Sequence, residues 1–151
     1  MPLLSRKVDY ALLILSHLNG HPSGASAREI AGRFELSRPF VANILKELCH
    51  KGFVASHRGV KGGYVLHRPV EAVSLAEVMD ALDDSFRLTE CTDSLPGESC
   101  NVMALCPLRH AIADVHQRLR DVLREVTLAD LFRPRCPGEP ETIELLLPAV
   151  N

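Results

Sequence analysis

Residues 37–66, SRPFVANILKELCHKGFVASHRGVKGGYVL, decide the fold expected for this chain. Apolar side chains recur at helical spacing in the first half, which predicts a helix that Ser37 caps, that runs to about Lys51 and that the following glycine ends. The second half predicts two short strands, 53–56 and 64–66, joined by a glycine-rich basic turn. The expected apolar side of the helix consists of Phe40, Val41, Ile44, Leu45 and Leu48.

The region upstream predicts two more helices. Residues 3–19 repeat apolar side chains at helical period until an Asn-Gly pair stops them. Ser26 and Glu29 have the spacing of a capping box, in which the serine caps the helix and the glutamate reaches back to the serine amide. This box opens a short helix at 27–33. Helix, short helix, turn, longer helix and hairpin follow one another as in a winged helix-turn-helix.

The region downstream predicts a second capping box and a long helix. Ser74 and Glu77 form the box, which opens a helix to about Leu82. After a cysteine-containing loop at about 87–106, apolar residues recur at steps of 4, 3, 4, 3 and 4, which is a heptad seam on one helix. The proline-rich tail from Arg133 has little potential to order. The seam consists of Leu108, Ile112, Val115, Leu119, Val122 and Val126.

The charge of the chain differs between its two parts. Residues 1–70 hold ten Lys/Arg against four Asp/Glu, and residues 71–151 hold seven against fifteen. This asymmetry favours a polyanion-binding half, although chance distribution over a solvated surface is the alternative. With 151 residues the chain can bury one sizeable core. No apolar run reaches the roughly 18 residues that span a bilayer, and the N-terminus is unlike a secretory signal, so we expect a cytoplasmic protein.

The polar side of the helix that follows Ser37 supplies candidates for DNA contact. The N-terminal residues of such a helix meet base edges in the major groove, where Asn43 suits an adenine edge and Arg38 a guanine or a phosphate. At the glycine-rich hairpin tip, Arg58 and Lys61 suit a minor groove or backbone phosphates. The alternative for each is an ordinary exposed side chain. The helix candidates are Ser37, Arg38, Pro39, Asn43 and Lys46.

Three of the five cysteines, Cys91, Cys100 and Cys106, lie within sixteen residues with the spacing C-x8-C-x5-C. An odd number of cysteines without a sign of secretion favours metal or redox use over structural disulfides. Zinc sites usually contain C-x2–4-C pairs, which this spacing fits badly, whereas a loop around an iron–sulfur cluster can use widely spaced thiolates. The alternative is three half-buried cysteines without a ligand.

Three thiolates leave a fourth ligand position. His110, four residues after the last cysteine, is one candidate, and its alternative is a plain helix-surface histidine. Asp9 is the other candidate if a dimer brings the first helix to the partner's cluster, and its alternative is a solvated charge. Cys49, within a helix, and Cys136, in the tail, are interpreted as incidental to this site.

These features together resemble the winged-helix iron–sulfur transcriptional regulators of the IscR and NsrR type, most of all the regulators of SUF iron–sulfur assembly operons. The resemblance covers about residues 1–132. The Arg-Gly-x-x-Gly-Gly-Tyr hairpin and the three cysteines are specific in combination, whereas the helices alone are not. The segments that carry the resemblance are Lys7–Ala11, Leu36–Phe40, Ser56–Leu66, Val73–Leu82 and Leu88–Cys91, with the two later cysteines.

The resemblance implies a homodimeric repressor or activator whose long C-terminal helices pair and whose cluster is bound by Cys91, Cys100 and Cys106. In NsrR-like members an aspartate from the partner's first helix completes a 4Fe–4S site, and Asp9 falls at that position. IscR-like members instead use a histidine three residues after the last cysteine, with a 2Fe–2S cluster. Arg109 stands there in this chain, so a 4Fe–4S cluster is expected in preference to 2Fe–2S.

The expected fold class is therefore mainly α, with four parts along the chain. A winged helix-turn-helix DNA-binding domain with a small β-hairpin wing covers 1–85, a cluster-binding loop 86–106, a long C-terminal dimerisation helix 107–132 and a flexible tail 133–151.

The expected function is transcriptional regulation that senses an iron–sulfur cluster and controls cluster-assembly genes. The alternatives are a nitric-oxide-sensing repressor of the same architecture and a zinc or thiol redox-switch DNA-binding protein. The expected partners are a double-stranded DNA operator and a second copy of the chain, with no membrane and no small-molecule substrate. No nucleophile–base pair or phosphate loop occurs in the sequence, so an enzyme is not expected.

Overall fold

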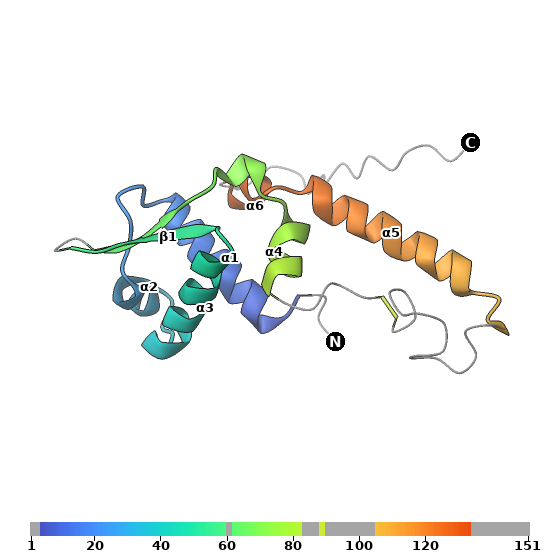
Figure 1. The fold of residues 1–151 in the computed structure, drawn as a ribbon, viewed down its shortest axis with the longest axis horizontal. Coiled ribbons are helices and arrows are strands. Elements are labelled where there is room, and N and C mark those ends of the chain that lie inside the picture. The colour runs from blue at the N-terminus through green and yellow to red at the C-terminus, as the bar shows by residue number, and fades with distance from the viewer. Residues whose placement is uncertain (1–3, 60–61, 83–87, 90–104, 134–151) are drawn as a thin grey trace, which may run out of the picture.

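The computed structural model of this chain describes residues 4–59, 62–82, 88–89 and 105–133. They form a mainly helical body with a β-hairpin at one end and a helix projecting from the other (Figure 1). In these residues no helix is long and apolar enough to cross a membrane. The elements are α1 (Arg6–Asn19), α2 (Ala27–Arg33), α3 (Arg38–His50), β1 (Val54–His57), β2 (Gly63–Leu66), the 3-10 helix η1 (Val70–Ala72), α4 (Leu75–Leu82), α5 (Arg109–Glu125) and α6 (Leu128–Phe132).

Each of the first three helices begins after a serine. Ser5 Oγ accepts a hydrogen bond from the Val8 amide at 3.3 Å. Ser26 Oγ accepts one from the Glu29 amide at 3.2 Å, while the Glu29 carboxylate accepts one from the Ser26 amide at 2.6 Å, which confirms the predicted capping box. Ser37 occupies the N-cap position of α3, but its side chain makes no capping hydrogen bond. The predicted serine cap is therefore right in position and wrong in its chemistry.

The predicted capping box of α4 is only half formed. Ser74 Oγ accepts a hydrogen bond from the Glu77 amide at 3.2 Å, as expected. The Glu77 carboxylate, however, pairs with the guanidinium of Arg68 instead of reaching back to Ser74. Arg68 also donates to the Ala72 carbonyl at 2.9 Å and so holds η1 against the start of α4. The Arg68 guanidinium offers the carboxylate an ion pair with two hydrogen bonds, whereas the Ser74 amide could offer only one hydrogen bond.

The hairpin is fixed to the body through β2. β1 and β2 pair antiparallel, with His57 opposite Gly63. On the other side of β2, Tyr64 exchanges two backbone hydrogen bonds with Ala25, at 3.0 and 2.9 Å. A Cβ on Gly63 would lie 2.8 Å from the Ala25 carbonyl oxygen, so glycine is needed for this close approach. The wing is thus attached to the residue that precedes the N-cap of α2.

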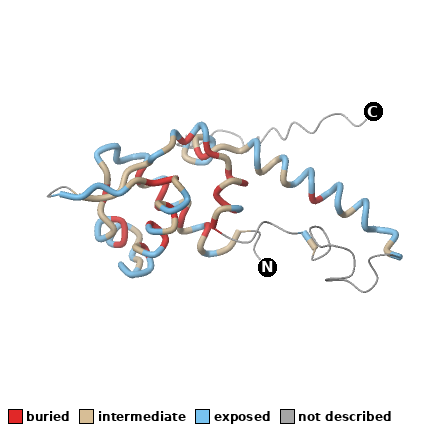
Figure 2. Tube along the Cα trace, in the orientation of Figure 1, coloured by how far each residue is buried: buried red, intermediate tan, exposed pale blue. Residues whose placement is uncertain are grey.

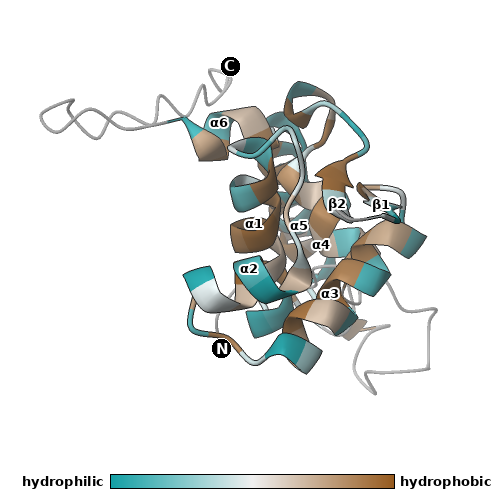
Figure 3. Cartoon of the chain, turned by 90° about the vertical axis from the view of Figure 1, so that its left-hand side faces the viewer, coloured by the Kyte–Doolittle hydropathy of each residue, from teal (hydrophilic) through white to brown (hydrophobic). Residues whose placement is uncertain are grey.

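The core lies between α1, α3, α4 and the base of the hairpin, and α1 crosses it as a largely hydrophobic ribbon (Figure 3). Phe40, predicted on the apolar side of α3, lies at the surface instead, 37% exposed and edge-on to the ring of Tyr10. Phe40 therefore lies at the edge of the apolar side of α3, whereas the next residue, Val41, is fully buried. The side chains with less than 2% exposure include Val8, Ile14, Leu15, Leu18, Ile30, Val41, Leu45, Leu48, Val73, Val78 and Leu128.

Lys7 joins the end of α4 to α3. Its Nζ donates to the Leu82 carbonyl at 2.6 Å and pairs with the Glu47 carboxylate at 2.8 Å. The last carbonyls of a helix have no partner within it, and a lysine near them is favourable. Lys7 therefore stabilises the C-terminus of α4, from which the chain leads toward the cysteines, and connects it to α3.

α5 leaves the body and is exposed along most of its length (Figure 2). Arg120 holds it to α4 through an ion pair with Asp80 at 2.7 Å. The helix predicted for 107–132 is interrupted, because the Val126 carbonyl accepts a hydrogen bond from the Leu75 amide at 2.8 Å. Thr127 then caps the separate helix α6 through a full capping box.

Candidate nucleic-acid interface and cysteine segment

α3 presents a polar stripe away from the core. Pro39, Asn43, Lys46 and His50 recur at steps of 4, 3 and 4, and all four are exposed. This spacing places them on one side of the helix, opposite its buried side. Three of them were predicted from the sequence. His50 was missed, although the helical spacing alone could have found it.

The start of α3 combines a positive helix end with a cationic side chain. Ser37 and Arg38 are exposed, and the Ser37 hydroxyl makes no capping hydrogen bond to the first turn. The amides of the first turn carry the partial positive charge of the helix dipole and suit an anion such as a phosphate. The structure thus brings Ser37, Arg38 and Pro39 to one polar corner of the molecule.

The wing carries the remaining predicted contacts. Arg58 and His57 are exposed at the end of β1. The turn is closed by a hydrogen bond from the Gly62 amide to the Gly59 carbonyl at 2.8 Å, and Gly59 has a φ of 136°, which favours glycine. Lys61, the other predicted contact, lies outside the described residues.

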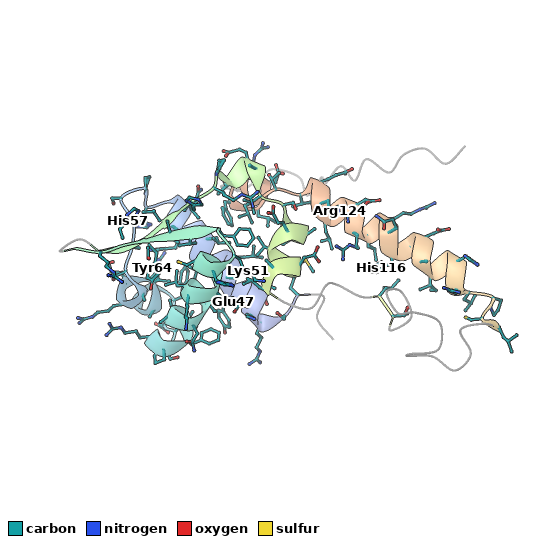
Figure 4. All side chains as sticks on the ribbon, viewed as in Figure 1. Glu47, Lys51, His57, Tyr64, His116 and Arg124 are labelled. Atoms are coloured by element: carbon teal, nitrogen blue, oxygen red, sulfur yellow. The ribbon has the colours of Figure 1, made fainter. Side chains whose placement is uncertain are left out.

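A pocket of about 340 Å³ lies between α2, the start of α3 and the wing. Three arginines from these three elements, Arg28, Arg38 and Arg58, line it together. His57 and Tyr64, which Figure 4 shows on the wing, line it too. The sequence did not single out Arg28. The complete set of lining residues is Ser26, Ala27, Arg28, Arg38, Ser56, His57, Arg58, Gly62, Gly63 and Tyr64.

The cysteine segment reaches the described part of the chain at Cys106. Cys106 is half-buried, makes no disulfide and lies three residues before α5. Cys91 and Cys100 lie outside the described residues. The two candidates for a fourth ligand, Asp9 on α1 and His110 on α5, are both exposed. Within the described residues no three His, Cys, Asp or Glu side chains come together as a metal site.

The donor chemistry fits an iron–sulfur cluster, because thiolates are its usual ligands and Cys106 is accessible. Cys49 differs from Cys106 in its place in the fold. It lies on α3, and burial raises the pKa of its thiol, which disfavours the thiolate that a metal needs. The interpretation of Cys49 as part of the body agrees with this.

His116 is the buried polar residue of α5, 5% exposed, in the part of the chain that the structure describes. Its Nδ1 accepts a hydrogen bond from the Leu88 amide at 3.4 Å, and Figure 4 shows it midway along the projecting helix. His116 therefore links α5 to a residue three positions before Cys91. No sequence pattern predicted this residue, because only the folded chain brings residue 88 to α5.

Comparison with known proteins decides the family. The sequence model of the Rrf2 family, described as iron-dependent transcriptional regulators, matches residues 4–134. The chain belongs to the Rrf2 family. Rrf2 proteins are transcriptional regulators that bind DNA and are not enzymes, so the predictions of a regulator and of no catalytic activity are confirmed.

Individual Rrf2 relatives cover nearly the whole chain. The HTH-type transcriptional regulator NsrR of Oceanobacillus iheyensis is 30% identical over 145 residues, which are 95% of each chain. Among solved structures, CymR (YrzC), the global cysteine regulator of B. subtilis, superposes with a TM-score of 0.68 at 28% identity, over 87% of this chain and 97% of CymR. IscR of T. potens superposes with a TM-score of 0.64 at 25% identity, over 85% of this chain and 84% of IscR. The predicted winged-helix fold is confirmed.

Proposed function

We propose that this Rrf2 regulator senses an iron–sulfur cluster and controls genes of iron–sulfur cluster assembly. One observation carries the proposal: a single chain combines an exposed, basic α3 and wing with the C-x8-C-x5-C segment between α4 and the projecting α5. The description of the family as iron-dependent supports an iron cofactor. The resemblance to the regulators of SUF operons supports the target genes.

DNA binding is assigned to the polar side of α3 and to the wing. The exposed Asn43 and Lys46 are suited to the major groove, where asparagine pairs with adenine and lysine with guanine or a phosphate. Arg58 and Lys61 on the wing are assigned to the adjoining minor groove or its phosphates.

A second copy of the chain is assigned to the seam on α5. Three residues of the predicted apolar stripe are exposed: Leu108 by 62%, Val115 by 47% and Leu119 by 39%. An exposed apolar stripe is what a second copy would cover. Apolar side chains at heptad spacing pack against an equivalent helix, and a dimer places two recognition helices at half-sites about 34 Å apart. The operator is therefore expected to be roughly palindromic.

The cluster is assigned to Cys91, Cys100 and Cys106, with a fourth ligand from another residue. Asp9 of a partner subunit gives a 4Fe–4S site, and its exposure on the first turn of α1 permits this. His110 is the alternative ligand, with a 2Fe–2S cluster.

The test is operator affinity with and without the cluster. Protein prepared without oxygen is titrated, by gel shift, into promoter DNA of the cluster-assembly genes, before and after removal of the cluster with a chelator. We expect the two affinities to differ by roughly 5- to 150-fold, which is the usual range of coupling between two sites. Specific DNA binding with equal affinity in both states contradicts cluster sensing and leaves the regulator assignment intact. A response to nitric oxide alone favours the nitric-oxide sensor.

A thiol-based switch is a second candidate, favoured by the likeness to CymR. The oxidized form of Staphylococcus aureus CymR superposes with a TM-score of 0.67 at 26% identity, over 91% of this chain. If this candidate holds, the purified protein carries zinc or no metal, and a thiol oxidant changes operator affinity without any iron. Elemental analysis of the purified protein separates the two candidates.

A further inference from the structure

We propose that the pocket between α2, α3 and the wing binds one phosphate of the DNA backbone, and that Arg28 is one of its ligands together with Arg38 and Arg58. This inference rests on the proposed DNA-binding function and extends it to a side chain outside the recognition helix and the wing. Three guanidinium groups from separate elements, Arg28, Arg38 and Arg58, line one pocket whose lining residues include no carboxylate. Guanidinium binds phosphate oxygens through paired, charge-assisted hydrogen bonds.

Two of these arginines stand where a helix disfavours them. Arg28 is the second residue of α2, and Arg38 is the first residue of α3. A cation in the first turn meets the positive end of the helix dipole, so it opposes folding of the free protein. The two positions share one property, that both side chains line the same pocket. An anion held there neutralises the cations and is itself favoured by the N-terminus of α3.

The backbone around the pocket holds the arginines in place. The double hydrogen bond between Ala25 and Tyr64 fixes the wing against the start of α2, three residues before Arg28. Gly63 makes this approach possible, since any Cβ there would meet the Ala25 carbonyl oxygen. The capping box of α2 is a second constraint near the pocket, because the Ser26 amide donates a hydrogen bond to the Glu29 carboxylate at 2.6 Å. The nearest acid in sequence is thereby bonded to the backbone.

The occupant is a DNA phosphate because the pocket adjoins both DNA-contacting elements. Arg38 belongs to the start of α3 and Arg58 to the wing, so a duplex that lies against both brings its backbone across the pocket. Phosphate contacts fix the register of a protein on DNA without reading the sequence. Arg28 is therefore assigned to affinity and positioning, and not to base recognition.

The test compares Arg28→Ala with Arg33→Ala in the full-length protein. Arg33 is also an exposed arginine on α2, but it ends the helix near His17 and does not line the pocket. Affinity for an operator duplex and for a random duplex is measured at several salt concentrations. We expect Arg28→Ala to weaken both by a similar factor, about tenfold or more, and to reduce the slope of log affinity against log salt by about 0.9, the value of one phosphate contact. Arg33→Ala should keep the slope of the wild type.

Thermal unfolding separates a binding defect from a folding defect. Because Arg28 opposes the dipole of α2, Arg28→Ala should unfold at the same or a higher temperature than the wild type while it binds DNA more weakly. Unchanged affinity and slope for Arg28→Ala, or equal effects of the two substitutions, overturn the pocket assignment. A loss confined to the operator assigns Arg28 to base recognition and also overturns it. A wild type that binds no DNA removes the proposed function itself, and the inference with it.

Discussion

The body and the projecting helix of this molecule are built in opposite ways. In the body, most apolar side chains of α1, α3 and α4 are buried, with Leu13 and Phe40 as exposed exceptions. On α5, large apolar side chains such as Val115 and Leu119 are exposed, and a polar one, His116, is buried. The body thus satisfies its own hydrophobic surface within one chain. Among the described residues, α5 leaves hydrophobic surface exposed, and a second copy of the chain is its proposed cover.

This difference shows where each part obtains its stability. The body depends on packing within the chain, so substitutions there should act on unfolding whatever the protein concentration. If a second copy covers α5, as proposed, substitutions on its seam should act on the monomer–dimer equilibrium. The predictions below separate the two.

The largest effect is expected from the core of the body. Leu45 is fully buried on α3, and Leu45→Ala should lower the free energy of unfolding by about 2–5 kcal/mol, through lost burial and the cavity left behind. Chemical denaturation at fixed protein concentration measures it. Leu13→Ala on α1 is the matched control, because Leu13 is 42% exposed, and it should cost less than about 1 kcal/mol. Similar losses for both leucines contradict a body that is stabilised by its own core.

The next effect is expected on the seam of α5. Leu119→Asp places a charge in the interface between two helices, so the dimer dissociation constant should rise at least roughly tenfold, or about 1.4 kcal/mol. Sedimentation equilibrium at several concentrations measures the change. Ala113→Asp adds the same charge on an exposed position outside the seam and should leave the association unchanged. An unaltered dimer in Leu119→Asp excludes α5 as the interface.

The smallest effect is expected at the start of α2 and depends on pH. The hydrogen bond from the Ser26 amide lowers the pKa of Glu29, so the charged carboxylate favours the folded state. Its contribution is complete above the ordinary glutamate pKa of about 4.3 and is lost as the pH falls through the lower, folded value. Glu29→Gln should therefore melt slightly below the wild type at pH 7, and the gap should close below pH ~4. A gap that persists at acid pH contradicts this assignment.

The body could be predicted from sequence where its signals were local. The capping box of Ser26 and Glu29 lies within four residues, and both of its hydrogen bonds formed as predicted. The box of Ser74 and Glu77 has the same local pattern, yet only one of its two hydrogen bonds formed. Arg68, nine residues before Glu77, forms an ion pair with the Glu77 carboxylate instead. Local patterns thus hold until a charged partner from elsewhere competes with them.

The candidate site could be predicted in part for the same reason. The α3 residues follow from helical period alone, and the structure exposes each of them. The pocket of Arg28 could not be predicted, because it exists only after Tyr64 pairs with Ala25 and brings the wing onto α2. His116 could not be predicted for a similar reason, since the amide that donates to it belongs to Leu88, far from it in sequence.

The most direct test of the cluster-sensing account is to count iron and acid-labile sulfide in protein purified without oxygen, together with its visible spectrum. The account predicts a coloured protein with about four iron and four sulfide per chain, or about two of each with His110 in place of Asp9 as ligand. Simultaneous Cys91→Ala, Cys100→Ala and Cys106→Ala should abolish both the colour and the iron. A colourless wild type that carries zinc or no metal would contradict the account and leave a DNA-binding regulator without an iron–sulfur sensor.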